Sequence, residues 1–163
     1  MFLKQKTQAF KEVSGVDISV PKLEILSDPK KHKHIHGDYD GDLVRMNDVA
    51  PIKSKDKLDQ NKELLNTIIH ELTHHDQAHL AENRKNENLK KALESDANIF
   101  SLNQNLYIQK GKDYKKQPLE SDAFHAGDTL SERLMKEVYK DPSTSFGNTD
   151  YKPKTISEKE RKN

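Results

Sequence analysis

The chain contains neither cysteine nor tryptophan, and it has only five tyrosines and five phenylalanines among 163 residues. The absence of cysteine excludes disulfides and thiolate metal ligands, and with them most structural zinc modules. A transition metal would have to be bound by histidine and carboxylate side chains, a ligand set typical of catalytic sites that keep one coordination position open. The eight histidines are therefore the first residues to consider as ligands.

Apolar residues are also scarce. They make up 32% of the chain, charged residues make up 34%, and the mean hydropathy is −1.02. The length fits one domain, which we expect to span residues 1–140. Such a polar domain has a small core, so a bound metal ion would add to its stability. Residues 141–163 are rich in Ser, Thr, Lys, Glu and Pro, and we expect them to form a disordered tail.

Long apolar runs and an excess of one charge are missing too. No stretch approaches the roughly 18 apolar residues of a membrane-spanning helix. The net charge is +1, with Lys and Arg spread along the chain, so we expect no binding to nucleic acid or to a membrane. Residues 1–13 lack the apolar segment of a secretory signal. We therefore expect a cytoplasmic protein, or one exported without a secretory signal peptide.

Residues 70–74 read His-Glu-Leu-Thr-His, an H-E-x-x-H motif. On a helix, positions i and i+4 lie on the same face, so His70 and His74 can bind one Zn²⁺ together. Glu71 follows the first ligand directly and can reach a water molecule on that metal. Residues 57–80 contain no Gly or Pro, and their apolar side chains recur at helical spacing. These apolar residues are Leu64, Leu65, Ile68, Ile69 and Leu72.

The remaining periodicity predicts an α+β fold, with an N-terminal helix and a small antiparallel or mixed sheet followed by three helices. We expect helices over residues 3–13, 57–80, 88–109 and 119–139, and strands over residues 16–20, 23–26 and 43–47. The last helix has an apolar stripe of Leu119, Ala123, Ala126, Leu130, Leu134 and Val138. The strand at 43–47 precedes the H-E-x-x-H helix, and its position in the sequence is compatible with two roles, an edge strand that could hold an extended substrate and a plain structural strand.

A catalytic zinc needs a third protein ligand. A third His ten residues after the first, the metzincin pattern, is excluded because that position is Leu80 and the expected glycine is Gln77. His79 is one position short and lies about 100° away around the helix. The other option is a Glu from a later helix, and Leu93-Glu94-Ser95-Asp96-Ala97 and Leu119-Glu120-Ser121-Asp122-Ala123 both offer one. The residues alone leave Glu94 and Glu120 open.

Three motifs in the chain belong together. They are His70-Glu71-x-x-His74-x-x-Gln77, Asn105-Leu106-Tyr107-Ile108 and Tyr114-x-x-Gln117-Pro118-Leu119-Glu120-x-Asp122-Ala123-Phe124. In this order they resemble a family of short gluzincin-like zinc metallopeptidases of phages, mobile elements and bacterial toxins or effectors. The resemblance covers residues 60–127 and implies a minimal zincin-like fold, a Zn²⁺ cofactor and a protein or peptide substrate. It also implies Glu120 as the third zinc ligand, with Glu94 as the alternative.

The chemistry expected of such a site is hydrolysis of a peptide bond. With zinc held by His70, His74 and Glu120, Glu71 would take a proton from the activated water and give it to the leaving amine. A further donor would stabilise the oxyanion. The candidates for that donor are Tyr39, Tyr107, Tyr114 and His125. The alternative function is a non-catalytic zincin-like regulatory or metal-binding protein.

Several further polar residues lie near the motif. Asp122 or Asp96 could orient a ligand histidine through its free ring N–H, and Asp122 could equally interact with a helix dipole. We expect His75 and His79 to be exposed polar side chains. We also expect an exposed basic loop or edge strand, and no second metal site, at His32, His34 and His36.

Overall fold

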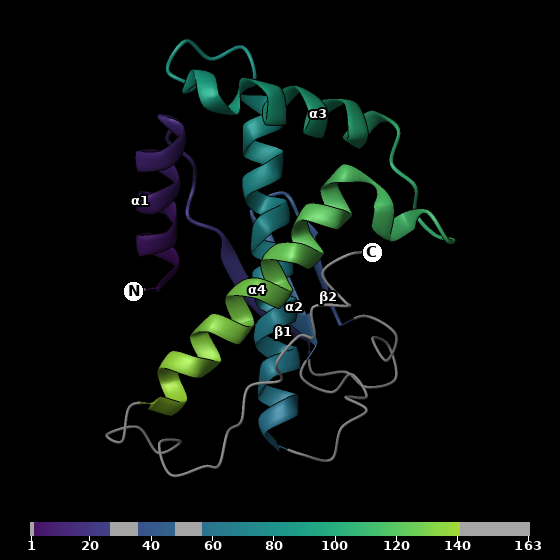
Figure 1. The fold of residues 1–163 in the computed structure, drawn as a ribbon. Helices are drawn as coiled ribbons and strands as arrows, with labels where there is room; N and C mark the ends of the chain where they lie inside the picture. Colours follow the sequence, from purple (N-terminus) through teal and green to yellow (C-terminus); the bar gives the residue numbers. More distant parts are fainter. Residues whose placement is uncertain (1, 27–35, 48–56, 141–163) are drawn as a thin grey trace, which may run out of the picture.

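The computed structural model describes residues 2–26, 36–47 and 57–140, and these form the α+β fold that the sequence predicts (Figure 1). The helices are α1 (Phe2–Ser14), α2 (Lys57–Glu82), α3 (Glu94–Asn105) and α4 (Pro118–Lys140). The strands are β1 (Lys22–Leu26), β2 (Gly37–Asp40) and β3 (Leu43–Asn47). Short 3-10 turns at Lys91–Leu93 and Tyr114–Lys116 precede α3 and α4.

The long helix α2 is the centre of the molecule. The strands β2 and β3 pack on it from one side, and α4 crosses it diagonally on the other (Figure 1). The sequence predicts this helix correctly, because its 26 residues include no Gly or Pro that would interrupt the hydrogen bonding. Its side chains can therefore reach both the sheet and α4.

The sheet has three described strands in the order β1-β3-β2, with β1 parallel and β2 antiparallel to β3. Of the two roles considered for residues 43–47, that of an edge strand is wrong, because β3 lies between the other two described strands. The edge strand beside α2 is β2. Gly41, at φ +63°, makes the tight turn between β2 and β3. Across this pair Arg45 binds the carboxylates of Asp38 and Asp40, at 2.9 and 3.0 Å.

Residues 16–20 do not form the predicted strand. Their alternating apolar pattern has another cause, because Val16 is buried in a cluster with Leu80, Leu89 and Ala97, and Ile18 packs against that cluster. Pro21 follows and has no N–H to continue a ladder. The segment is an extended connection that joins α1 to β1, and it packs against the C-terminal end of α2 through Val16 and Leu80.

The later helices differ from their predicted outlines. α3 is shorter than the predicted 88–109, and Tyr107 lies beyond its end. α4 begins at Pro118, a residue that suits the first position of a helix. Its buried row is Leu119, Ala123, Gly127, Ser131 and Met135. This strict i, i+4 ridge is typical of helices that cross at a large angle, and it leaves the predicted core residues Leu130 and Leu134 about 42% and 39% exposed.

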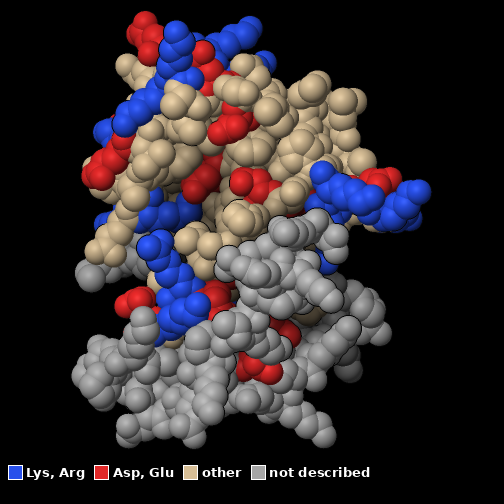
Figure 2. Space-filling model, in the orientation of Figure 1, with Lys and Arg blue, Asp and Glu red and all other residues tan. Residues whose placement is uncertain are grey.

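Several predictions concern residues that the structure does not describe. They are the tail at 141–163 and the histidines His32 and His34; His36 is described and is exposed. Within the described ranges, no helix has the length and apolar character that crossing a membrane requires. On the face in Figure 2, positive and negative side chains lie intermixed, in keeping with the near-neutral net charge.

Candidate metal centre

The residues His70 and His74 lie one turn apart on α2, and both point to the same side of the helix. Their Nε2 atoms are 3.0 Å apart, with the ring planes perpendicular. His70 is 8% exposed, so this nitrogen pair lies at the edge of the core. Helical geometry thus brings two imidazole nitrogens together, as the i, i+4 spacing predicts.

Glu120 joins this pair from the first turn of α4. Its carboxylate oxygens lie 3.4 Å from His70 Nε2 and 3.3 Å from His74 Nε2, and its side chain is 1% exposed. The other predicted candidate, Glu94, is exposed at the start of α3 and is not among the residues of this group. The structure therefore brings together His70, His74 and Glu120.

The spacing of these three donors suits a zinc ion. Ligands at about 2.0–2.1 Å in a tetrahedral site are roughly 3.3 Å from one another, close to the observed 3.0, 3.3 and 3.4 Å. Two buried atoms of the group, His70 Nδ1 and Glu120 Oε2, have no hydrogen-bond partner among the described residues. A cation between the three side chains would satisfy the orphaned carboxylate oxygen.

Interactions within this group shift the pKa values of two of its members, Glu120 and His74. Burial alone would raise the pKa of Glu120, but the nearby imidazoles of His70 and His74 and the Tyr107 phenol outweigh it and hold this pKa below its ordinary value. Burial likewise opposes charge on His74, but Glu120 and Gln77 outweigh it and raise the pKa of His74. Without a metal, the carboxylate is thus kept ionised and favours a positive charge beside it.

A chain of hydrogen bonds fixes the ring of His74. Its Nδ1 lies 2.8 Å from Gln77 Oε1, and an N–H there donates to this amide oxygen, so that Nε2 keeps its lone pair for a metal. The Gln77 amide nitrogen donates to Leu119 O at 3.0 Å and to Asp122 Oδ2 at 2.8 Å. Asp122 therefore acts on His74 through Gln77, while Asp96 is exposed on α3.

A second buried network fixes the start of α4. Asn103 Oδ1 accepts the N–H of Leu119, and its amide donates to Gln117 Oε1. Gln117 in turn bonds both the N–H and the C=O of Ile108, at 3.0 and 2.8 Å. These bonds hold the segment before α4 against its first turn, where the Tyr107 phenol donates to the Glu120 carboxylate. Sequence reasoning assigned no role to Gln77, Asn103 or Gln117, although two of them stand in the quoted motifs.

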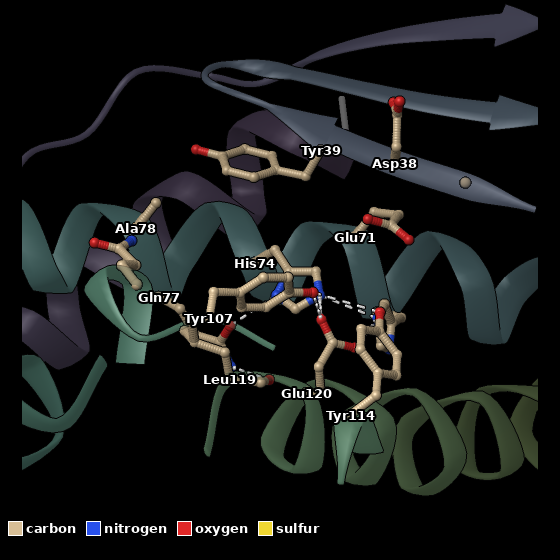
Figure 3. A pocket seen from close by; sticks show the side chains of 13 residues that line it. Asp38, Tyr39, Glu71, His74, Gln77, Ala78, Tyr107, Tyr114, Leu119 and Glu120 are labelled. Carbon is tan, nitrogen blue, oxygen red and sulfur yellow. Dashed lines mark hydrogen bonds and ion pairs between the residues drawn. The ribbon is translucent and has the colours of Figure 1, made fainter. Parts of the chain in front are cut away.

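His70, His74 and Glu120 line a cleft of about 450 Å³ between β2 and the start of α4. Figure 3 shows Glu71 on the side of α2 that faces Asp38 and Tyr39, while Glu120 and Tyr114 lie on the other side. Burial raises the pKa of Glu71, which makes its carboxylate a stronger base than an exposed one. Gly37 lets the strand come close, since a Cβ there would be 3.0 Å from Glu71 Cγ.

Three of the four predicted oxyanion donors line this cleft. They are Tyr39, Tyr107 and Tyr114, whereas His125 is exposed on α4 and does not line it. Burial, with the negative charge of Asp42, raises the pKa of Tyr39 to about 12, so its phenol keeps its proton. Burial also raises the pKa of Tyr107, as does its bond to Glu120.

The prediction that His75 and His79 are exposed is wrong. His75 is fully buried, and the side chain of His79 is 15% exposed. Both face the turn between β2 and β3, where Asp42 lies 3.2 Å from His79 Nε2. The prediction missed the burial of these two histidines because the periodicity of a single helix does not show that a sheet packs on this face of α2.

Comparisons of the chain with protein-family models, curated protein sequences and solved structures gave no match. The function proposed below is therefore supported by the sequence motifs and by the geometry of the cleft.

Proposed function

We propose that the protein is a zinc-dependent metallopeptidase with a minimal zincin-like arrangement. The observation that carries the proposal is the convergence of His70 and His74 from α2 with Glu120 from α4, at the mutual spacing of zinc ligands. Glu71 stands beside them in the same cleft. Two imidazoles, one carboxylate and an adjacent buried Glu form the set of groups that metal-assisted peptide hydrolysis needs.

In this proposal the zinc ion supplies Lewis-acid activation of water and of the substrate carbonyl. Glu71 takes the proton from the attacking water and gives it to the leaving amine, a role that its raised pKa favours. The protonated phenols of Tyr39 and Tyr114 are the donors available to the oxyanion, because the O–H of Tyr107 is already donated to the Glu120 carboxylate. Gln77 and Asp122 keep His74 in the tautomer that a metal ligand requires.

The substrate is proposed to be an extended segment of a protein or peptide. β2 is one of the two edge strands of the described sheet, and its residues Gly37, Asp38 and Tyr39 line the cleft. An extended chain can pair with such an edge through main-chain hydrogen bonds. This would lay a peptide bond across the cleft between Glu71 and Glu120.

The variant Glu71→Gln tests the proposal. It should keep the zinc content of the wild type and lose peptidase activity by about 10²–10⁴-fold or more, because it removes the general base and spares the ligands. The assay follows cleavage of a mixture of unstructured peptides by mass spectrometry. Glu63→Gln, an exposed position on the same helix, is the matched control and should cleave like the wild type. If Glu71→Gln cleaves as fast as its control, the role of Glu71 as general base is wrong. If the wild type binds zinc and cleaves nothing, the non-catalytic zincin-like alternative replaces the enzyme.

A further inference from the structure

We propose that the chain holds a second transition-metal ion, separate from the cleft, at Asp42, His75 and His79. Nitrogen or oxygen atoms of these three side chains lie within 4.8 Å of one another. His75 and His79 stand at i and i+4 on α2. This is the same spacing as that of His70 and His74, which lie about one and a half turns closer to the start of the helix. Asp42 comes from the turn between β2 and β3 that packs over them.

A buried, unpartnered nitrogen points to a ligand here. His75 is 0% exposed, and within the described ranges its Nε2 has no hydrogen-bond partner. This nitrogen lies 3.6 Å from Asp42 Oδ1, too far for a hydrogen bond, and His79 Nε2 lies 3.2 Å from the same oxygen. An ion about 2.1 Å from each donor would fit between them and would satisfy the buried nitrogen.

The outer nitrogens of both rings face carboxylates, as is common for metal-bound histidines. His75 Nδ1 lies 3.5 Å from Asp76 Oδ1, and His79 Nδ1 lies 3.5 Å from Glu82 Oε2. A carboxylate on this side favours the Nδ1–H tautomer and leaves Nε2 free to bind. Lys6 of α1 pairs with Asp76 and fixes it in place. Ser19 donates to Asp42 Oδ1 at 2.6 Å and orients the third ligand.

The two sites are distinct. Five residues separate them along α2, which corresponds to about 7.5 Å of rise and about 140° of rotation. They share no ligand, and the ions would be too far apart for a bridged two-metal centre, whose spacing is about 3.5–4 Å. A second ion would instead tie the β2–β3 turn to α2. The ring of Tyr39 meets His75 edge-on at 5.9 Å, and Tyr39 also lines the cleft. An ion at Asp42, His75 and His79 would therefore also stabilise the wall of the cleft that β2 forms.

The ligand chemistry selects the class of metal. Two imidazoles and one carboxylate suit Zn²⁺ and its neighbours Ni²⁺ and Cu²⁺, whereas Ca²⁺ and Mg²⁺ require mostly oxygen ligands. Zinc is therefore the appropriate probe, and calcium or magnesium should not compete for it.

The test is the zinc content of the full chain, stripped with a chelator, reloaded with excess Zn²⁺ and freed of loose ions by gel filtration. The wild type should hold about two zinc ions per chain. Asp42→Asn and His79→Gln should each hold about one, and Glu120→Ala should also hold about one. Asp42 is half exposed, so Asp42→Asn keeps the test informative if His79→Gln folds poorly. His36→Ala, an exposed histidine outside both sites, is the control and should keep both ions.

Two results would overturn this second site. One is a wild type with a single zinc that Glu120→Ala loses and Asp42→Asn retains, which would leave the proposed peptidase intact. The other is a second zinc that survives in both Asp42→Asn and His79→Gln, or that His36→Ala removes. Conversely, an ion lost only from Asp42→Asn and His79→Gln would support the second site and count against the cleft.

Discussion

The imidazole of His74 is held at both of its nitrogens, and this residue shows what sequence spacing can predict. The i, i+4 spacing predicts that Nε2 meets its counterpart on His70. It does not predict what fixes Nδ1, because Gln77 acts only when the carbonyl of Leu119 and the carboxylate of Asp122 come to it from α4. Interactions within one helix are readable from the sequence, whereas contacts between helices require the packing.

Replacing Gln77 should therefore weaken both zinc binding and the stability of the fold, although its side chain carries no charge. In Gln77→Leu the Nδ1–H of His74 and the carbonyl of Leu119 lose their partners. We expect zinc affinity to fall about 10–100-fold, with a loss of about 1–3 kcal/mol in the free energy of unfolding. Competition with a chelator of known affinity measures the first effect, and urea unfolding measures the second.

The control for this change is Gln104→Leu, which alters the same residue type at another position in the cleft wall. It should bind zinc like the wild type. Equal zinc affinity for Gln77→Leu and Gln104→Leu would show that the ring of His74 needs no orienting partner.

At the scale of elements, the sequence predicts the helices that a single local feature determines. It does not predict the features that depend on how elements pack together. α2 and the start of α4 follow from unbroken helical periodicity and from Pro118. Residues 16–20 alternate because two of them pack into a cluster, a pattern that a strand would also give. The order of the strands and the i, i+4 row of α4 depend on how elements cross, which periodicity within one element does not specify.

The distance between β2 and α2 should be set by Gly37. A Cβ at this position would lie 2.8 Å from Thr67 Cγ2 and 3.0 Å from Glu71 Cγ. Gly37→Ala must therefore push the edge strand away from the helix or displace Glu71. We expect unfolding free energy to fall by about 1–3 kcal/mol and kcat to fall by roughly 10²-fold, because small displacements of a catalytic group are costly.

Removing the nearest contact should rescue part of this loss. Thr67→Ala deletes the methyl group that the new Cβ would meet, so the double variant should be closer in kcat to Thr67→Ala alone than Gly37→Ala is to the wild type. Unchanged activity in Gly37→Ala would mean that β2 does not constrain Glu71.

For the whole molecule, the buried charges of the metal centre make stability depend on pH. With zinc removed by a chelator, Glu120 has a pKa below its unfolded value, so the unfolded chain binds more protons under acid conditions. Its stabilising contribution is complete above about pH 4.3 and is lost as the pH falls further. His74 has the opposite sign, since its raised pKa stabilises the fold below about pH 6.5 and this is lost as the pH rises. Between about pH 4.3 and pH 6.5, Glu120 and His74 therefore both stabilise the fold.

Urea unfolding of the zinc-free protein from pH 3 to pH 7 measures this dependence. Glu120→Gln should remove a slope of up to about 1.4 kcal/mol per pH unit on the acid side. It should also weaken the contribution of His74, which depends on this carboxylate. Glu94→Gln, an exposed Glu in the similar segment, should keep the wild-type profile. Identical acid slopes in the two variants would contradict the charge distribution described for the centre.

The central claim is that His70, His74 and Glu120 bind one zinc ion in a catalytic cleft. The most direct test is a crystal structure of the zinc-loaded protein with anomalous scattering recorded at the zinc edge. The account predicts an anomalous peak about 2.0–2.2 Å from the Nε2 atoms of both histidines and from the Glu120 carboxylate. A fully loaded crystal with no peak between these three side chains, or with a peak there that is completed by Glu94, would contradict it.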